Sequence, residues 1–281
     1  QKTRISLNSE LGINEIDGFP IFVDGPTYAQ WRNDIAISQG LKPSYLGDEL
    51  PLPEDVVGTD WVKRIIRTGF NRKYSLSISG GGTTSRYFLA SSFIQNEGIL
   101  IGTDFSRGNI RLNLNNNLTD RLSVATSVNY VLSKSNRSGE GSGAIANSGA
   151  IFRAYSNNPA ASPSDPIDQG DGLNNFFNDP LRELEDTTNE TYQQTLILSF
   201  LTKYSISEGF DFNITTGTTS VNSRRELFFP RTTRLGDLFD SRAVINTRET
   251  KNYLIEPYFS YRKKFNNQHN LNTTLGLSSQ V

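Results

Sequence analysis

The chain has 281 residues, and its 28 Lys and Arg are balanced by 29 Asp and Glu, which argues against nucleic acid or an anionic membrane surface as the main partner. It contains no Cys, which excludes disulfides and thiol-bound metal, and its one histidine, His269, removes most His-based metal and triad chemistry from consideration. The mean hydropathy is −0.46, and no segment approaches the roughly 20 apolar residues of a membrane helix. Transmembrane barrels share this composition, because half of each strand faces a polar lumen.

Apolar and polar residues alternate along most of the chain. In the first such segment, Ile5, Leu7 and Leu11 alternate with polar side chains between Arg4 and Ile13. A period of two is typical of strands with one apolar and one polar face. The pattern predicts about nine strands, which cover residues 4–13, 73–79, 85–96, 109–115, 122–132, 196–206, 210–215, 253–261 and 271–277. Both faces of the segment 85–96 carry apolar residues, so its inward side is not assigned.

Two of the connecting segments have helical character. Thr27 to Gln39 is predicted to be a short helix, with Pro26 before it and Gly40 after it. A second helix is predicted from Ala144 to Tyr155, ahead of a Pro-rich segment. Connections of this length usually carry function.

Short and long connections alternate strictly. The short ones fall at residues 80–82, 118–121, 207–209 and 266–267, and the long ones at residues 14–69, 98–104, 134–190 and 222–249. An up-and-down barrel has this parity, because its short turns lie on one membrane face and its long loops on the other. A Greek-key sandwich does not require it. The sequence therefore predicts an all-β, antiparallel, up-and-down transmembrane β-barrel segment, with apolar rows facing lipid and Ser, Asn and Thr rows facing a wet lumen.

Charged residues in the polar rows are candidates for the lumen. They would line a transport path, or merely hydrate and pair with a plug, and the pattern does not separate these interpretations. The predicted lumen-facing residues are Arg4, Glu10, Lys73, Arg111, Asp211 and Glu256.

Aromatic residues near several strand ends suit the interfacial girdles of a barrel, although strands favour aromatics in any case. They are Phe70, Tyr74, Tyr130, Tyr192, Phe210, Tyr253, Tyr261 and Phe265.

Three aromatic residues in the long connections are candidate loop contacts: Trp31, Trp61 and Tyr155. The two tryptophans could stack on sugar rings, but anchoring of their loops by burial is the favoured interpretation.

Asp165, Asp168, Asp171 and Asp179 suggest a calcium loop, but their spacing is not that of an EF-hand. A solvated surface loop is favoured, and no metal site or cofactor is expected. The segment from Gly80 to Thr84 lacks the Lys and the helix of a phosphate-binding loop and is interpreted as a hairpin turn. No nucleophile, base and orienting group cluster at a recognisable spacing, so no catalytic residues are predicted and no enzyme is expected.

An ordered series of segments resembles SusC/RagA-type TonB-dependent receptors of the outer membrane. No single motif is decisive, but the series covers most of the chain. Its parts are Thr59-Asp60-Trp61 with Arg67 to Phe70, then Ser79-Gly80-Gly81, Arg86-Tyr87-Phe88, Asn96-Glu97-Gly98-Ile99, Asp104-Phe105, Arg111 to Leu114 and Leu118 to Leu122, and finally Tyr253 to Phe265 and His269 to Gly276.

The resemblance implies a barrel of about 22 strands filled by an N-terminal plug. It also implies import of oligosaccharides or peptides with energy from TonB, a SusD-like lipoprotein as lid, and the outer membrane of a Gram-negative bacterium of the Bacteroidota. The chain departs from this pattern because it shows no TonB box, plug or signal, and too few strands. Residues 1–281 are therefore expected to be the N-terminal part of the barrel domain, with TonB engaged through the absent N-terminal region. The connection from Lys134 to Glu190 is predicted, on its length alone, to touch a partner.

Two alternatives remain open beside nutrient import. One is a structural or secretion-associated outer-membrane barrel that binds a protein partner without transport. The other is a soluble all-β adhesin module. A TonB box and plug upstream would favour import, and a need for detergent during extraction would exclude the adhesin.

Overall fold

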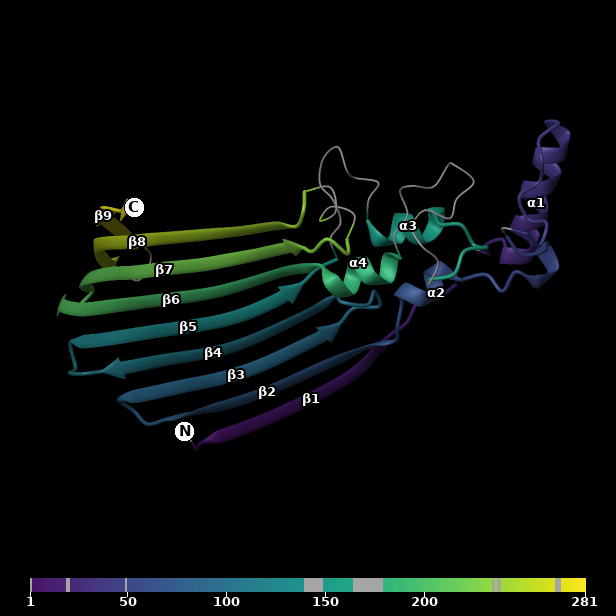
Figure 1. The fold of residues 1–281 in the computed structure, drawn as a ribbon. Helices are drawn as coiled ribbons and strands as arrows, with labels where there is room; N and C mark the ends of the chain where they lie inside the picture. Colours follow the sequence, from purple (N-terminus) through teal and green to yellow (C-terminus); the bar gives the residue numbers. More distant parts are fainter. Residues whose placement is uncertain are drawn as a thin grey trace.

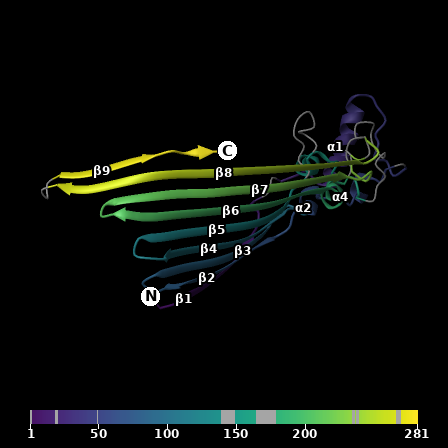
Figure 2. The same cartoon turned by 90° about the vertical axis from the view of Figure 1, so that its left-hand side faces the viewer.

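The computed structural model describes residues 2–18, 21–48, 50–138, 149–163, 179–233, 236, 239–265 and 269–281. These residues form a single antiparallel sheet, with short helices gathered at one end of it (Figure 1). Figure 2 shows that the strands run alongside one another in chain order, with the helices beyond their far ends. The predicted all-β, antiparallel, up-and-down architecture is confirmed.

Within the described residues the sheet has ten strands. They are β1 (Arg4–Asn14), β2 (Gly69–Gly81), β3 (Ser85–Glu97), β4 (Asp104–Asn117), β5 (Leu122–Asn136), β6 (Thr188–Ser207), β7 (Phe210–Phe229), β8 (Arg242–Phe265), β9 (His269–Gly276) and β10 (Ser279–Gln280). Each strand from β1 to β8 pairs with the next, and β8 also pairs with both β9 and β10. The predicted last strand, residues 271–277, corresponds to β9, and the chain continues along β8 through Ser279 and Gln280.

The connections alternate in length as predicted. Residues 82–84, 118–121 and 208–209 close short turns at one end of the sheet, which we call the turn end. At Gly209 the backbone has φ of 75°, and a Cβ there would lie 2.2 Å from the carbonyl oxygen of Arg262, so glycine is required. Residues 15–68, 98–103, 137–187 and 230–241 join the strands at the opposite end, the loop end.

The prediction that residues 222–249 form a long loop is wrong. β7 continues to Phe229 and β8 begins at Arg242, so the connection is only residues 230–241. The reason is that polar side chains occupy both faces here, so the alternation that marks a half-apolar strand is missing.

The helices lie in the long connections. They are α1 (Gly25–Ser38), the 3-10 turn η1 (Pro53–Asp55), α2 (Trp61–Ile65), α3 (Ala150–Ser156) and α4 (Pro180–Asp186). The predicted helix at residues 27–39 is confirmed as α1, and the second predicted helix is α3, with residues 144–148 outside the described residues. No helix in the described parts of the chain is long and apolar enough to cross a membrane.

The apolar core lies at the loop end and not in the sheet. One cluster gathers Trp61, Val62 and Ile65 of α2 with side chains from α3, α4 and the β3–β4 connection. A second cluster contains Ala29, Tyr45 and Val56 around α1. We call these helices and the connections that pack with them the helical layer. It fixes the loop ends of the strands relative to one another, because its residues come from three separate connections.

Candidate functional site

The sheet has one polar and one apolar face along its whole width. Directly paired residues share a face and successive residues alternate, so the register assigns every strand residue to one side. The polar face contains Ser75 and Ser77 of β2, Asn109 and Asn113 of β4, and Thr215 of β7. The apolar face carries the rows that begin with Ile5, Leu7, Leu11 and Ile13 of β1.

All six residues predicted to face a lumen lie on the polar face. The register pairs Glu10 with Lys73 and Arg4 with Ser79. It also places Arg111 opposite Ala90, which itself faces Ser77, and Glu256 opposite Thr215. Asp211 lies four residues from Thr215 on β7, so it is on the same face. The six side chains are spread from β1 to β8, so they form a charged wall and not one compact site.

Two ion-pair groups stand out on the polar face. The Lys73 Nζ lies 2.9 Å from the Glu10 Oε1, with both side chains exposed. Near the turn end, the buried Asp211 carboxylate lies 3.0 Å from the Lys203 Nζ and 3.1 Å from an Arg262 guanidinium nitrogen. It also accepts a hydrogen bond of 2.8 Å from the Ser205 hydroxyl. The Lys203 and Arg262 cations balance the charge of the Asp211 carboxylate. Glu10 and Lys73, by contrast, remain exposed on the polar face.

The structure resolves the one strand whose inward side the sequence left unassigned. On β3, Phe88, Ala90 and Ile94 lie on the polar face, and Leu89 and Phe93 lie on the apolar face. Two large apolar residues therefore interrupt the Ser and Asn rows of the polar face. They explain why both faces of this segment look apolar in the sequence.

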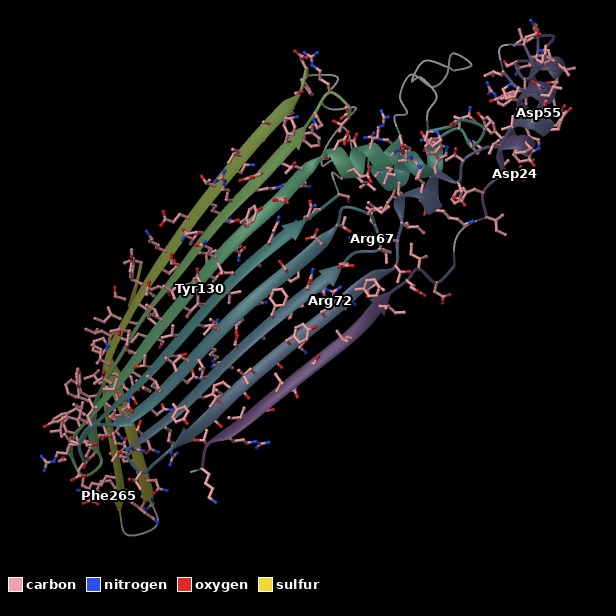
Figure 3. All side chains as sticks on the ribbon, turned by 60° about the horizontal axis from the view of Figure 1, so that its bottom comes forward. Asp24, Asp55, Arg67, Arg72, Tyr130 and Phe265 are labelled. Carbon is pink, nitrogen blue, oxygen red and sulfur yellow. The ribbon has the colours of Figure 1, made fainter. Side chains whose placement is uncertain are left out.

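All eight aromatic residues that suited an interfacial girdle lie on the apolar face. The register gives this assignment for Phe70 and Tyr74 of β2, and it holds equally for the other six, which are Tyr130, Tyr192, Phe210, Tyr253, Tyr261 and Phe265. Near the turn end, the Phe210 ring lies 5.7 Å from that of Phe259 and 6.2 Å from that of Tyr261. Figure 3 shows Phe265 at the turn end and Tyr130 in the body of its strand.

A cavity of about 730 Å³ opens in the helical layer. Its wall comes from the start of α1, from residues 57–63 and from the end of α3 with Pro159. Close backbone contact holds these segments together: a Cβ at Gly58 would lie 2.8 Å from the Pro159 carbonyl oxygen and 2.9 Å from the Gly25 Cα. Sequence reasoning did not find this cavity, because its lining comes from segments about 100 residues apart with no motif in common.

The three predicted loop-contact residues have different roles. Trp61 is 6% exposed and its indole N–H donates a hydrogen bond of 2.9 Å to the Asn158 carbonyl oxygen, so it anchors its loop as the favoured interpretation expected. Tyr155 is exposed at the cavity and its ring stacks on Phe22 at 5.2 Å. Trp31 is exposed on α1, away from the cavity lining, so the prediction that it anchors its loop by burial is wrong.

Two ion pairs hold the helical layer together. The Arg153 guanidinium of α3 lies 3.0 Å from the Glu183 carboxylate of α4, and both side chains are buried. Removing one partner of such a pair would leave an uncompensated buried charge. Arg64 of α2 lies 2.9 Å from Asp179, and hydrogen bonds to that carboxylate raise the pKa of the Arg64 guanidinium.

Asp24 and Asp179 act as helix caps. The Asp24 carboxylate accepts a hydrogen bond of 2.9 Å from the Thr27 backbone N–H, and hydrogen bonding with Thr27 lowers the pKa of Asp24. Asp179 caps α4 by accepting from the Leu181 backbone N–H. Figure 3 shows Asp24 and Asp55 together at the far side of the helical layer.

The acidic segment that suggested a calcium loop lies mostly outside the described residues, which exclude Asp165, Asp168 and Asp171. Asp179, its fourth acidic residue, is described, and it caps α4 and pairs with Arg64. Within the described residues, no group of three or more His, Cys, Asp or Glu side chains could hold a metal ion.

A two-faced antiparallel wall in up-and-down order, with its long connections gathered at one end, defines a segment of a transmembrane β-barrel. No family model matches the chain. It is 24% identical to the TonB-dependent receptor P3 of Formosa agariphila, over 99% of this chain and 27% of that receptor. It is 23% identical to the TonB-dependent receptor P26 of the same organism, over 99% of this chain and 28% of the relative. The chain thus spans little more than a quarter of either receptor's length.

Solved structures show the same fold. The RagAB peptide importer in its closed-closed state matches 99% of this chain and 34% of its own, with a TM-score of 0.73 and 15% sequence identity. Its open-open state matches 98% of this chain with a TM-score of 0.71 and 14% identity. The comparisons confirm the resemblance to SusC/RagA-type TonB-dependent receptors. The chain corresponds in fold to part of the RagA barrel.

Proposed function

We propose that the chain forms part of the wall of a plugged outer-membrane barrel in a bacterium of the Bacteroidota, and that the whole protein imports an oligomeric nutrient with energy from TonB. The cargo class is an oligosaccharide or a peptide, and a SusD-like lipoprotein serves as lid. The proposal includes no catalytic step and no cofactor. The carrying observation is the polar face, on which charged residues from β1 to β8 line one side of a sheet whose other side carries the apolar rows.

Two further observations support the proposal. The relatives are TonB-dependent receptors, and the similar structures are of an importer described with a RagB partner. The helical layer also lies at the loop end, where a lid and an incoming substrate would first meet the barrel (Figure 1). Its cavity of about 730 Å³ is large enough for a short oligomer segment.

The test is uptake by cells that carry the full-length receptor, compared with cells that lack its gene. Labelled oligosaccharides and labelled peptides are supplied in parallel, with and without a protonophore that removes the energy source of TonB. Import predicts uptake of one cargo class that needs both the gene and the proton gradient. Equal uptake with and without the gene would overturn the proposal and favour a structural or secretion-associated barrel.

A matched pair of variants then tests the role of the polar face. Arg111→Gln removes a cation from the polar face, and Arg224→Gln removes one from the opposite face. If the polar face lines the path, only the first substitution changes the rate of uptake at low cargo concentration. An equal effect of both would contradict the assignment of the path to this face.

A further inference from the structure

The apolar face ends in an oblique edge. Toward the loop end, Leu132 is the last apolar residue of β5 on this face, and Lys134 and Asn136 follow it. Leu132 faces Gln194 on β6, where the continuous apolar row ends earlier, at Leu196, and Tyr192 lies alone beyond Gln194. Leu196 in turn faces Ser220 on β7.

The edge continues to move toward the turn end across the sheet. On β8 the continuous row ends at Tyr253, which faces Thr218, and beyond it come Lys251, Glu249 and Thr247, with Ile245 further toward the loop end. On β1 and β2, by contrast, apolar residues reach Ile13 and Phe70 near the loop end. The edge thus shifts by about one residue per strand, as a level lipid boundary must when it crosses strands that tilt in a barrel. The loop-end parts of β6 to β8, where polar side chains outnumber Tyr192, Phe228 and Ile245 on this face, then lie beyond the lipid.

Four ion pairs lie near this edge on the apolar face. Lys134 and Lys251 come directly after the last apolar residues of β5 and β8, Arg72 lies between Phe70 and Tyr74 on β2, and Arg224 lies four residues beyond Ser220 on β7. Arg72 lies 4.0 Å from Glu97, Lys134 lies 2.8 Å from Glu190, and Arg224 lies 2.7 Å from Glu226. Lys251 pairs with Glu249 in the same way. In each pair the carboxylate belongs to a row nearer the loop end than the cation. Within the described residues, the four ion pairs of this face all have this polarity.

The cations are available to a second partner. Their side chains are 40–56% exposed, and in three of the four pairs the cation is more exposed than its carboxylate. The Lys134 ammonium also lies over the Tyr192 ring, 5.1 Å from its centroid. The alkyl stems of Lys and Arg can cover the apolar edge while the charged ends reach out of it.

We propose that Arg72, Lys134, Arg224 and Lys251 form a headgroup rim, which binds the phosphate groups of anionic lipids in the leaflet at the loop end. The order of the charges in each pair favours an anionic lipid. A phosphate at the lipid boundary attracts the cation, and the carboxylate lies further from the lipid, toward the loop end. The inference rests on the membrane location in the proposed function, but not on import.

The test compares variants of the full-length receptor purified in detergent from outer membranes. One variant carries R72Q, K134Q, R224Q and K251Q. A control carries R107Q, R225Q and R248Q, which remove cations from the polar face at the loop-end half of the same wall. Bound lipid phosphorus per protein is measured directly, and native mass spectrometry counts phosphatidylglycerol molecules bound from mixed micelles.

The rim variant is expected to lose binding by about fivefold for each cation removed, and the control by much less. Equal retention by the rim variant and the unchanged receptor, or an equal loss in the control, would overturn the proposal. Resistance of the folded band to SDS before heating confirms that each barrel is assembled. Uptake assays on the same variants separate failure of the rim from failure of the import proposal.

Exchanging the cation and the carboxylate within two of the ion pairs tests whether the order of the charges matters. The variant K134E/E190K/K251E/E249K keeps both ion pairs and the net charge but places the carboxylates at the apolar edge. Lipid binding is expected to fall although the pairs persist. Unchanged binding would show that polarity does not matter and would overturn the headgroup rim.

Discussion

Ten of the twelve buried hydrophobic side chains in the described residues lie in the helical layer and its connections, and only Val131 and Phe229 lie in strands. Strands nevertheless make up 59% of the described residues. Large apolar residues on the wall, such as Leu7 and Leu11, are more than 70% exposed. The helical layer is therefore packed as a water-soluble core, whereas the wall leaves its apolar face for an apolar solvent. Substitutions of the same kind should act differently in the two regions.

The largest effect is expected from truncating the anchor of the helical layer. Trp61→Ala removes a buried indole and its hydrogen bond to Asn158, and should destabilise the helical layer by about 3–5 kcal/mol. Hydrogen exchange of residues 58–66 and 158–161 in the full-length receptor measures the loss. Trp31→Ala is the control, because this side chain is 54% exposed, and it should change stability by less than about 0.5 kcal/mol. Similar losses in both variants would contradict the anchoring role of Trp61.

A slightly smaller loss of stability is expected when a charged side chain is introduced on the apolar face of the wall and not on its polar face. Phe200→Arg places a cation among the apolar rows of β6, and Ser199→Arg places one on the polar face next to it. The first should destabilise the barrel by about 2–4 kcal/mol, because a cation near the middle of the lipid is poorly solvated. The second should have little effect. Urea unfolding of the full-length receptor in lipid vesicles measures both, and equal destabilisation would mean that the apolar face does not meet lipid.

The sequence was sufficient to predict the wall where its two faces differ in polarity. Alternation identified the strand from Arg4 to Ile13, and the parity of the connections gave the up-and-down order. The loop-end parts of β7 and β8 were not predicted as strands, because Asn222, Arg224 and Glu249 place polar side chains on the otherwise apolar face there. The strands still pair at those positions because the register set nearer the turn end continues along them. The sequence of a single segment does not show this register.

The helical layer was predicted less well for a different physical reason. α2 has five residues and α4 has seven, too short for a periodic signal, and burial against other connections stabilises them. The caps Asp60 and Asp179 were visible signals, but caps alone also occur in turns. The cavity depends on contacts between residues far apart in sequence, such as Trp61 and Asn158, and local patterns do not encode them.

The smallest expected effect concerns the Glu10–Lys73 pair, and it addresses what covers the polar face. Both side chains are exposed in this wall, at 64% and 47%, so a double-mutant cycle of Glu10→Gln and Lys73→Gln should give a coupling of at most about 1 kcal/mol. Added salt should weaken it further, because exposed charges are screened. A coupling well above that value in the full-length receptor, insensitive to salt, would mean that another part of the protein desolvates the pair. A weak, salt-sensitive coupling would instead place the pair in water, as a lumen open to a passing substrate requires.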